Sequence, residues 1–332
     1  MRVLVTGASG LLGREVTGLL VRQGHAVTTF QRRRAGVDGA ADLSGSVTDD
    51  TAVRRAVAGA EAVIHLAAKV SFTGRAADFD EVNVDGTRRL LRAARDAGVR
   101  DLVFVSSPSV ANSGAAIAGL GAEPADPARA HGDYSRTKAE AELLALAADS
   151  PDFRVAAVRP HIVWGPGDTQ LVERVLERAG RGHLPLLDAG AALIDTTYVD
   201  NAASAIVAAL HRIEHIHGRA LVITNGEPRP VGELLAGICA AGGVPAPSWR
   251  VPGRLARAAG SVVEKLWARS GRSDEPPMTR FLAEQLSTAH WFDQRETREL
   301  LDWTPAVSLD DGLARLAEHY GSLPVGSPVD FQ

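Results

Sequence analysis

A tyrosine and a lysine four residues apart are the first pair in this sequence that could do chemistry. They lie in the segment Tyr134-Ser135-Arg136-Thr137-Lys138, so a helix there would place both side chains on one face. The ammonium of Lys138 is expected to lower the pKa of the Tyr134 phenol, which could then give a proton to a carbonyl oxygen or take one from an alcohol. The pair therefore predicts acid–base catalysis at a carbonyl or hydroxyl group. The alternative is an amphipathic helix whose tyrosine happens to precede a lysine.

A serine that could assist the same reaction lies about thirty residues earlier in the chain. Ser107 directly follows an apolar run that reads as a buried strand, and ligands of open α/β sheets bind beyond the carboxyl ends of strands. Its hydroxyl could polarise the same carbonyl. Ser106 and Ser109 have similar chemistry, and we favour Ser107 over both.

A glycine-rich turn follows the first apolar run, and its residues are Gly7-Ala8-Ser9-Gly10-Leu11-Leu12-Gly13. Three glycines at this spacing permit a tight turn, close approach of a pyrophosphate, and tight packing of the next helix, whose N-terminus favours anions. An ordinary strand-to-helix turn would account for one or two of these glycines. We interpret Gly7, Ser9, Gly10, Leu11, Leu12 and Gly13 as a dinucleotide-binding loop.

The end of the second apolar run bears on the choice between NAD and NADP. A site for NAD usually has an acidic residue there to accept the ribose 2′-hydroxyl, whereas this chain continues with Gln31, Arg32 and Arg33. Guanidinium groups are suited to a 2′-phosphate, so the sequence favours NADP(H) and leaves NAD(H) as the alternative. The competing interpretation is a solvated arginine run on a surface loop.

The elements that must position these residues alternate along the first half of the chain. Apolar, β-branched runs predict strands, and segments with apolar residues at i, i+3 and i+4 predict helices between them. The expected strands are 2–6, 26–30, 62–66, 102–106 and 155–158, and the expected helices are 11–23, 51–57, 82–97 and 135–148. This alternation predicts an α/β fold with a doubly wound parallel sheet of the Rossmann type. After about Trp164, Pro and Gly interrupt shorter elements. We therefore expect a dinucleotide-binding domain over 1–164 and a smaller substrate lobe over 165–332, with some chain returning to the core.

Composition excludes several classes of protein. The 332 residues are 45% hydrophobic and 23% charged, which is ordinary globular usage rather than disorder. A net charge of −4 argues against a nucleic-acid-binding protein, and the single Cys239 cannot form a disulfide within the chain. No apolar stretch is long enough to span a bilayer, no signal peptide is evident, and no cluster has metal-ligand spacing. We expect a cytoplasmic protein without a metal site, in which His65 and His161 have structural rather than catalytic roles, and the sequence leaves a homodimer open.

Several motifs together, in this order along nearly the whole chain, resemble an extended short-chain dehydrogenase/reductase. They are the glycine turn, Val63-Ile64-His65-Leu66-Ala67-Ala68, Asn83-Val84-Asp85-Gly86-Thr87, the Ser107, Tyr134 and Lys138 set, Arg159-Pro160-His161 through Asp168, and Asp195-Thr196-Thr197-Tyr198 through Ala202. The resemblance implies that Ala67 and Ala68 line the cofactor groove, that Asn83 organises the active site, and that Lys138 also contacts the nicotinamide ribose. It also implies that Pro160 and His161 border the nicotinamide. One departure is Ser46, which stands where the family usually has an Asp that contacts the adenine.

Within this family the chain is most similar to the 3β-hydroxysteroid dehydrogenase-like branch, and there to reductases of 2-alkyl-3-oxoalkanoic acids in bacterial olefin and β-lactone biosynthesis. This resemblance implies a small hydrophobic carbonyl or hydroxy substrate. The alternatives are a 3β-hydroxysteroid or sterol dehydrogenase, a sugar-nucleotide epimerase or dehydratase, and a non-catalytic NADP sensor, against which the intact Tyr134 and Lys138 pair argues. The segment Val251 to Arg269 reads as an amphipathic helix with cationic flanks that could hold an acyl chain, contact a membrane surface, or pack on its own lobe.

Overall fold

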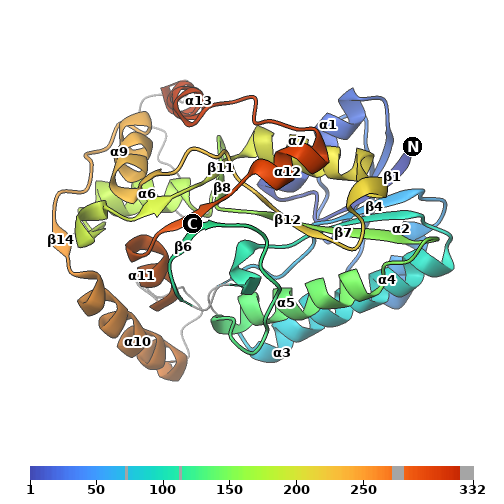
Figure 1. Cartoon of the computed structure of the whole chain (residues 1–332), viewed down its shortest axis with the longest axis horizontal. Coiled ribbons are helices and arrows are strands. Elements are labelled where there is room, and N and C mark those ends of the chain that lie inside the picture. The colour runs from blue at the N-terminus through green and yellow to red at the C-terminus, as the bar shows by residue number, and fades with distance from the viewer. Residues whose placement is uncertain (72–73, 112–113, 271–279, 322–332) are drawn as a thin grey trace.

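A seven-stranded parallel sheet forms the core of one half of the molecule, on the right in Figure 1. The computed structural model describes residues 1–71, 74–111, 114–270 and 280–321, and the side chains of 261–262, 264–270 and 280–282 lie outside that description. The strand order is β3-β2-β1-β4-β5-β7-β12. The bounds of these strands are β1 (Arg2–Thr6), β2 (Ala26–Gln31), β3 (Ala41–Ser44), β4 (Ala62–His65), β5 (Asp101–Val105), β7 (Arg154–Pro160) and β12 (Ala220–Ile223). The expected Rossmann-type fold is confirmed.

Helices cover both faces of this sheet, as the crossover between parallel strands requires. One face packs against α2 (Asp50–Val57), α4 (Gly86–Asp96) and α5 (Gly132–Ala147). The other packs against α1 (Leu11–Arg22), α7 (Val199–His211), α8 (Ile213–Ile216) and α12 (Arg295–Leu301). Because α7 and β12 come from the second half of the chain, that half completes both the sheet and one of its two apolar cores.

Two features of the sheet region differ from the pattern in the sequence. The segment expected as one helix over 82–97 is a π-helix, η1 (Asp80–Asp85), followed by α4, with the short α3 (Ala76–Phe79) before it. The strand patterns identify neither β3 nor β12. Strand β3 lies at the sheet edge and carries polar residues, and β12 lies where the alternation of strands and helices has ended.

A second group of elements lies beside the carboxyl edge of the sheet. A four-stranded sheet has the order β13-β10-β15-β6, with bounds β6 (Ile117–Leu120), β10 (Leu193–Ile194), β13 (Arg229–Pro230) and β15 (His290–Phe292). Two further pairs are β8 (Val163–Trp164) with β11 (Thr197–Tyr198), and β9 (Leu186–Leu187) with β14 (Arg250–Val251). The remaining elements are α6 (Val172–Gly180), α9 (Val231–Ala241), α10 (Gly253–Ser270), α11 (Arg280–Ser287), α13 (Leu309–Gly321), η2 (Pro108–Ala111) and η3 (Asp188–Gly190).

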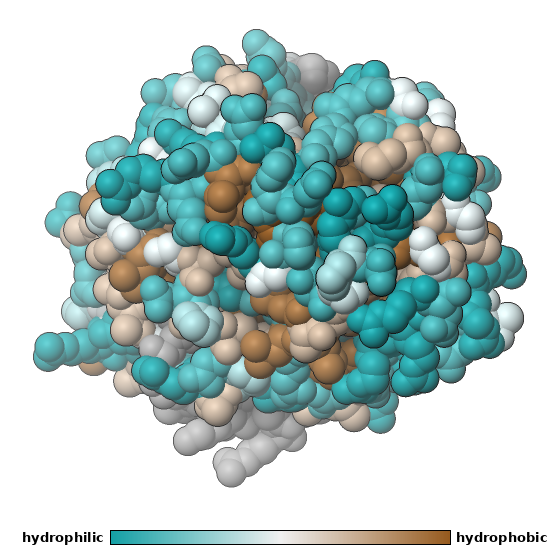
Figure 2. All heavy atoms as spheres, turned by 45° about the vertical axis from the view of Figure 1, so that its right-hand side comes forward, coloured by the Kyte–Doolittle hydropathy of each residue, from teal (hydrophilic) through white to brown (hydrophobic). Residues whose placement is uncertain are grey.

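A third apolar core holds this group together. Helices α6, α9 and α13 pack around Trp164 and Tyr198, whose rings meet edge to face at 5.4 Å between centroids. On the face drawn in Figure 2, hydrophobic residues form separated areas between hydrophilic side chains. Within the described residues, no helix combines the length and the apolar character needed to cross a bilayer.

Candidate active site

The glycine-rich turn lies between the end of β1 and the start of α1. Gly7 has a positive φ of 76°, and a Cβ there would come within 2.7 Å of the backbone nitrogen of Ala67. A Cβ at Gly13 would meet the Gly7 carbonyl oxygen at 2.4 Å, so both glycines are required by contacts inside the protein. At Gly10 a Cβ would meet only the Gly7 oxygen at 3.8 Å. Gly10 is thus the glycine whose missing side chain leaves room for a ligand rather than for the protein.

The surroundings of this turn fit a dinucleotide. Gly10 precedes α1 without a side-chain cap, and α1 has no acidic residue in its first turn, so its N–H groups and positive dipole end suit an anion. The turn contacts the segment after β4 that contains Ala67 and Ala68, and the Ala67 N–H donates to Thr6 Oγ1 at 3.1 Å. Ser9 lies half-buried in the turn, whereas Leu11 and Leu12 pack against the core around Trp164.

The residues at the end of β2 are arranged by an aspartate that the sequence pattern does not single out. Asp42 on β3 pairs in register with Thr29, and its carboxylate accepts hydrogen bonds from Thr29 Oγ1 at 2.6 Å and from Gln31 Nε2 at 2.9 Å. It also accepts from the Ala35 and Gly36 N–H groups. These bonds, the Thr29 hydroxyl first, lower the pKa of Asp42 to about 2.

Because of this network, Gln31 and the two arginines that follow it have different environments. Gln31 is buried against Asp42, and its Oε1 finds no partner among the described residues. Arg32 and Arg33 are exposed and form no ion pair with any described residue. Ser46 lies two residues beyond β3, with its hydroxyl 2.8 Å from that of Thr48.

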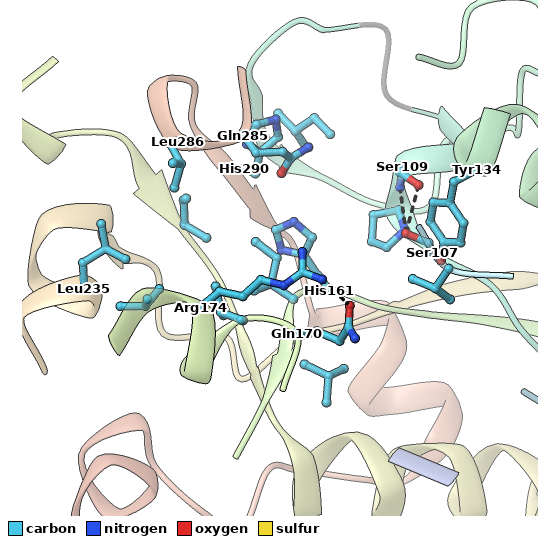
Figure 3. Close-up of a pocket in the computed structure, with 18 of the residues that line it drawn as sticks. Ser107, Ser109, Tyr134, His161, Gln170, Arg174, Leu235, Gln285, Leu286 and His290 are labelled. Atoms are coloured by element: carbon cyan, nitrogen blue, oxygen red, sulfur yellow. Dashed lines mark hydrogen bonds between the residues drawn. The ribbon is translucent and has the colours of Figure 1, made fainter. Parts of the chain in front are cut away.

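A cavity of about 340 Å³ opens beside the carboxyl ends of β5 and β7. Ser107, Ser109, Tyr134 and His161 line it, so residues from three separate segments meet there (Figure 3). Ser107 Oγ accepts from Ser109 Oγ at 3.0 Å, and the Ser107 hydroxyl lies close enough to the Tyr134 phenol to lower its pKa. Ser106 is buried outside the cavity, and its hydroxyl finds no partner among the described residues.

The phenol of Tyr134 does not have the lowered pKa that its spacing from Lys138 predicts. Burial raises the pKa of Tyr134 to about 12, and the smaller, opposite effect of the Ser107 hydroxyl does not offset it. Burial also lowers the pKa of Lys138 to about 7, and this outweighs the raising effect of Glu142. The prediction for the phenol is therefore wrong for this structure, because loss of solvation dominates for both groups.

Helix α5 presents Tyr134, Lys138 and Glu142 at i, i+4 and i+8. The Lys138 ammonium donates to the Val105 carbonyl at 2.7 Å and lies 4.1 Å from the Phe104 ring centroid. Glu142 forms a buried salt bridge with Arg159 of β7, whose Nε lies 2.9 Å from Glu142 Oε2. These contacts fix α5 against β5 and β7. The sequence pattern did not identify the bridge, because its partners are seventeen residues apart on different elements.

Asn83 lies in the π-helix η1 and does not line the cavity. Its amide is buried, accepts from the Lys69 N–H at 2.7 Å, and donates to Thr137 Oγ1 of α5 at 3.0 Å. It therefore links the segment after β4 to the helix that carries Tyr134. π-Helical turns of this kind often occur at functional sites.

Two histidines occupy different environments. His65 is buried between Thr6 Oγ1 at 2.7 Å and Thr87 Oγ1 at 3.0 Å, and burial lowers its pKa to about 3. His161 lines the cavity, its Nδ1 lies 2.6 Å from the Asp195 carbonyl oxygen, and burial lowers its pKa to about 4. Both rings are neutral near pH 7.

Pro160 ends β7 beside Ile223. Two residues further on, Ile162 lines the cavity and has an unusual positive φ of 43°.

Most of the cavity wall comes from beyond residue 160. The aliphatic wall includes Leu171, Val175, Leu184, Ile194, Leu235 and Leu286. No described residue of Val251 to Arg269 lines the cavity: Leu255 is 63% exposed, whereas Ala256 packs against Leu187 and Ala283. The side chains expected on the second half of that helix, Val262, Lys265, Leu266, Trp267 and Arg269, lie outside the described residues.

A doubly wound sheet, a glycine turn that fits a dinucleotide, and a Tyr–Lys helix beside a cavity together define a Rossmann-type oxidoreductase class. The chain belongs to the NAD dependent epimerase/dehydratase family, whose model matches residues 3–224, and so to the extended short-chain dehydrogenases/reductases. It is an NAD(P)-dependent oxidoreductase of that type.

Named relatives come from the expected branch. A 2-alkyl-3-oxoalkanoate reductase of Stenotrophomonas maltophilia (strain K279a) is 39% identical over 324 residues, covering 95% of this chain and 98% of that protein. A 3-beta-hydroxysteroid dehydrogenase of Mycolicibacterium neoaurum is 30% identical, covering 97% and 92%. Among solved structures, a double mutant of the dTDP-glucose 4,6-dehydratase DesIV of Streptomyces venezuelae, with NAD and DAU bound, superposes with a TM-score of 0.75 at 23% identity, covering 97% of each chain.

Proposed function

We propose that this protein reduces the 3-keto group of a long-chain 2-alkyl-3-oxoalkanoic acid to the 3-hydroxy acid with NADPH. The observation that carries the proposal is the meeting of Ser107 and Tyr134 on the wall of a largely aliphatic cavity. The 39% identity to a reductase of that name over almost the whole chain supports the same substrate class.

In this proposal Tyr134 is the proton donor and Ser107 binds the ketone oxygen. When bound, the nicotinamide cofactor supplies the hydride that forms the new C–H bond at the ketone carbon. The Tyr134 phenol gives its proton to the ketone oxygen and so forms the new O–H bond, while the Ser107 hydroxyl holds that oxygen in place. With a pKa near 12, the free phenol keeps its proton throughout the neutral range, which suits a donor in the direction of reduction.

The other residues of the expected site have supporting roles in the proposal. Lys138 lies one turn from Tyr134, and in its protonated form it would stabilise the phenolate left after transfer. Gly7, Ser9, Gly10 and Gly13 would hold the pyrophosphate at the start of α1, with Leu11 and Leu12 behind them. Ala67, Ala68, Pro160 and His161 would border the rest of the cofactor, and Asn83 positions α5.

Arg32 and Arg33 support a preference for NADP(H) over NAD(H). Asp42 is a carboxylate beside the end of β2, and its oxygens are already engaged by Thr29, Gln31 and two backbone N–H groups. The exposed guanidinium groups are then the strongest ligands near that edge for a 2′-phosphate.

We expect the double variant Arg32→Ala with Arg33→Ala to bind NADPH roughly 10- to 100-fold more weakly, as loss of charge-assisted hydrogen bonds predicts. Binding of NADH should change little, because no 2′-phosphate is present to lose its partners. Fluorescence titration with both cofactors measures the two constants. Equal dissociation constants for NADPH and NADH in the unchanged protein would remove the basis for the preference.

The function is tested by a substrate panel with purified protein. Long-chain 2-alkyl-3-oxo acids, 3β-hydroxysteroids and UDP-sugars are supplied with reduced or oxidised cofactor, and turnover is followed by absorbance and mass spectrometry. We expect turnover of the oxo acid, with affinity improving by up to ~0.8 kcal/mol per added methylene until the cavity is full. Comparable efficiency on a 3β-hydroxysteroid would assign the steroid branch, and activity on a UDP-sugar alone would contradict the proposal.

A further inference from the structure

Four residues other than glycine have a positive φ in the part of the chain that the structure describes, namely Ile162, Asp188, Ala189 and Asp302. Sixteen described glycines also have a positive φ, a conformation that glycine adopts readily. A short polar residue such as Asp302, which ends α12, tolerates it as well. Ile162 is the β-branched member of the four, and for a β-branched residue a φ of 43° is a strained conformation.

The chain passes from one sheet to another at Ile162. Pro160, the last residue of β7, pairs with Ile223 in the seven-stranded sheet. Val163 begins β8 and pairs with Thr197 of β11 in a separate sheet. Ile162 lies directly before β8, so its left-handed conformation belongs to the bend between the two sheets.

Hydrogen bonds hold the backbone on both sides of this bend. The His161 N–H donates to the Ile223 carbonyl at 3.0 Å, and the Thr197 N–H donates to the Ile162 carbonyl at 3.2 Å. The buried Thr197 hydroxyl donates to the His161 carbonyl at 2.8 Å. The surrounding structure therefore imposes the left-handed conformation on whichever residue stands at position 162.

The side chain at this bend lines the cavity that contains the candidate catalytic residues. Ile162 lines it together with His161, Ser107 and Tyr134, of which Figure 3 labels the last three. Glycine would relieve the strain and leave a gap in the wall, and asparagine would relieve it and place an amide there. Isoleucine keeps the strain and presents an aliphatic surface to the cavity. Such an outlier at a candidate site points to a functional role for the side chain.

We propose that Ile162 is a specificity-determining residue, whose aliphatic side chain contacts the alkyl part of the substrate and favours it over a polar group at the same point of the wall. Contact of this kind removes apolar surface from water on both partners, which is the main source of affinity for an alkyl chain. The inference rests on the proposed function, since it names a residue by which the proposed substrate is selected. The competing explanation is that Ile162 serves the fold alone, because it also packs against the apolar core around Trp164.

The test measures binding of a long-chain 2-alkyl-3-hydroxyalkanoic acid, the product of the proposed reduction, by calorimetry on the full-length protein with NADP⁺ present. The central variant is Ile162→Asn, because asparagine tolerates the left-handed conformation and the bend should be kept. We expect it to bind the acid roughly 10-fold more weakly, with a less negative heat capacity of binding, since less apolar surface leaves water. The dissociation constant of NADP⁺ should not change.

Two further variants distinguish contact with the ligand from a role in the fold. Ile162→Leu keeps an aliphatic side chain and should bind the acid with an affinity close to that of the unchanged protein. The matched control is Ala189→Asn, which makes a similar change at a residue that also has a positive φ, 61°, and does not line the cavity. It should leave binding of the acid unchanged.

Unfolded protein lowers the calorimetric stoichiometry and not the dissociation constant, so a partly unfolded variant still gives an answer. An unchanged dissociation constant and heat capacity in Ile162→Asn would overturn the inference. Equal weakening in Ile162→Leu or in Ala189→Asn would also overturn it, because the loss would then not depend on the aliphatic surface in the cavity.

Oxidation of the acid by NADP⁺, measured in the same samples, separates this inference from the proposed function. Weaker binding in Ile162→Asn alone, without oxidation by any form of the protein, would support the role of Ile162 and contradict the reductase. Oxidation by the unchanged protein, with unchanged binding in Ile162→Asn, would support the reductase and contradict the role of Ile162.

Discussion

Tyr134 and Lys138 illustrate how burial controls the chemistry of single residues in this molecule. Each group is shifted toward its neutral form, the phenol to a pKa of about 12 and the amine to about 7. Both shifts follow from loss of solvation, which disfavours whichever form is charged. A neutral phenol poised next to Ser107 is the state required of a proton donor in reduction.

Replacement of Tyr134 by Phe removes the proposed donor while keeping the ring. We expect turnover of the oxo acid to fall by on the order of 100- to 10,000-fold, as for loss of a general acid, with NADPH affinity retained. Steady-state kinetics and a cofactor titration measure the two effects. Tyr320→Phe on α13 is the matched control, and wild-type turnover in Tyr134→Phe would exclude the proposed donor.

His65 gives a stability prediction whose sign follows from its lowered pKa. The unfolded chain takes up a proton near pH 6.5, whereas the folded chain resists until about pH 3, so folding loses stability as the pH falls between these values. From pH 6.5 to pH 4.5 the loss is roughly 2 kcal/mol, because the slope of about 1.4 kcal/mol per unit is reached only well below pH 6.5.

Urea unfolding of the unchanged protein and of His65→Asn across this pH range tests the point. The variant should be less stable at pH 7, and its deficit should shrink as the pH falls, because it has no imidazole to charge. Thr87→Val keeps the imidazole and should keep the full pH dependence. A deficit in His65→Asn that does not change with pH would show that another group causes the acid sensitivity.

At the scale of elements, α5 and α6 each depend on polar contacts that determine where their side chains point. Glu142 and Arg159 join α5 to β7 inside the protein, and Asn83 joins α5 to the segment after β4. Asp168 accepts hydrogen bonds from the Gln170 and Val172 N–H groups and so holds the segment that leads into α6. Positioning of the candidate site is therefore shared among several elements.

The Asp168→Ala variant tests whether Asp168 positions α6 or only stabilises the fold. We expect the free energy of unfolding to fall by about 1 kcal/mol, as for loss of side-chain hydrogen bonds to backbone N–H groups, and KM for the acid to rise more than kcat falls. Asp49→Ala removes a carboxylate that accepts from backbone N–H groups at the start of another helix, since Asp49 accepts from Thr51 and Ala52 of α2, and α2 does not line the cavity. It should destabilise to a similar degree without changing KM, so equal kinetics in the two variants would contradict the role given to Asp168.

At the scale of the whole molecule, the two halves of the chain share one sheet. Strand β12 pairs with β7 through Ala220 to Ile223, and α7 buries Ile206, Val207 and Leu210 against the sheet. Burial of three such side chains is worth roughly 5 to 9 kcal/mol, which is comparable to the whole stability of a typical domain.

A fragment of residues 1–164 should therefore not fold by itself, although it contains the glycine turn, Tyr134 and Lys138. Circular dichroism and hydrogen exchange should show it largely unprotected, with no binding of NADPH. Addition of the complementary fragment 165–332 should restore protection in β7 by supplying β12 and α7. A cooperative, NADPH-binding fragment of residues 1–164 would mean that these contacts are dispensable.

The features that could be predicted from the sequence are local ones. The glycine turn, the i and i+4 spacing of Tyr134 and Lys138, and the alternation of apolar strands with amphipathic helices each depend on residues close together in the chain, so the Rossmann-type fold could be predicted and is confirmed. The serine at the end of β5 follows from the rule that ligands meet the carboxyl ends of parallel strands, and the structure brings Ser107 and Tyr134 to the same cavity.

The tertiary structure decides what each apolar face packs against and which polar groups become buried. Arg174 and Arg178 look like solvated helix residues in the sequence, and only the packing of Val172 and Leu176 into the core turns them toward the cavity. Asp42 reaches the end of β2 only through the pairing of β2 with β3, and the raised pKa of Tyr134 arises only from its surroundings in the fold. The physical reason is the same in each case: periodicity specifies that a face is buried, whereas its partner and its solvation depend on residues far away in the sequence.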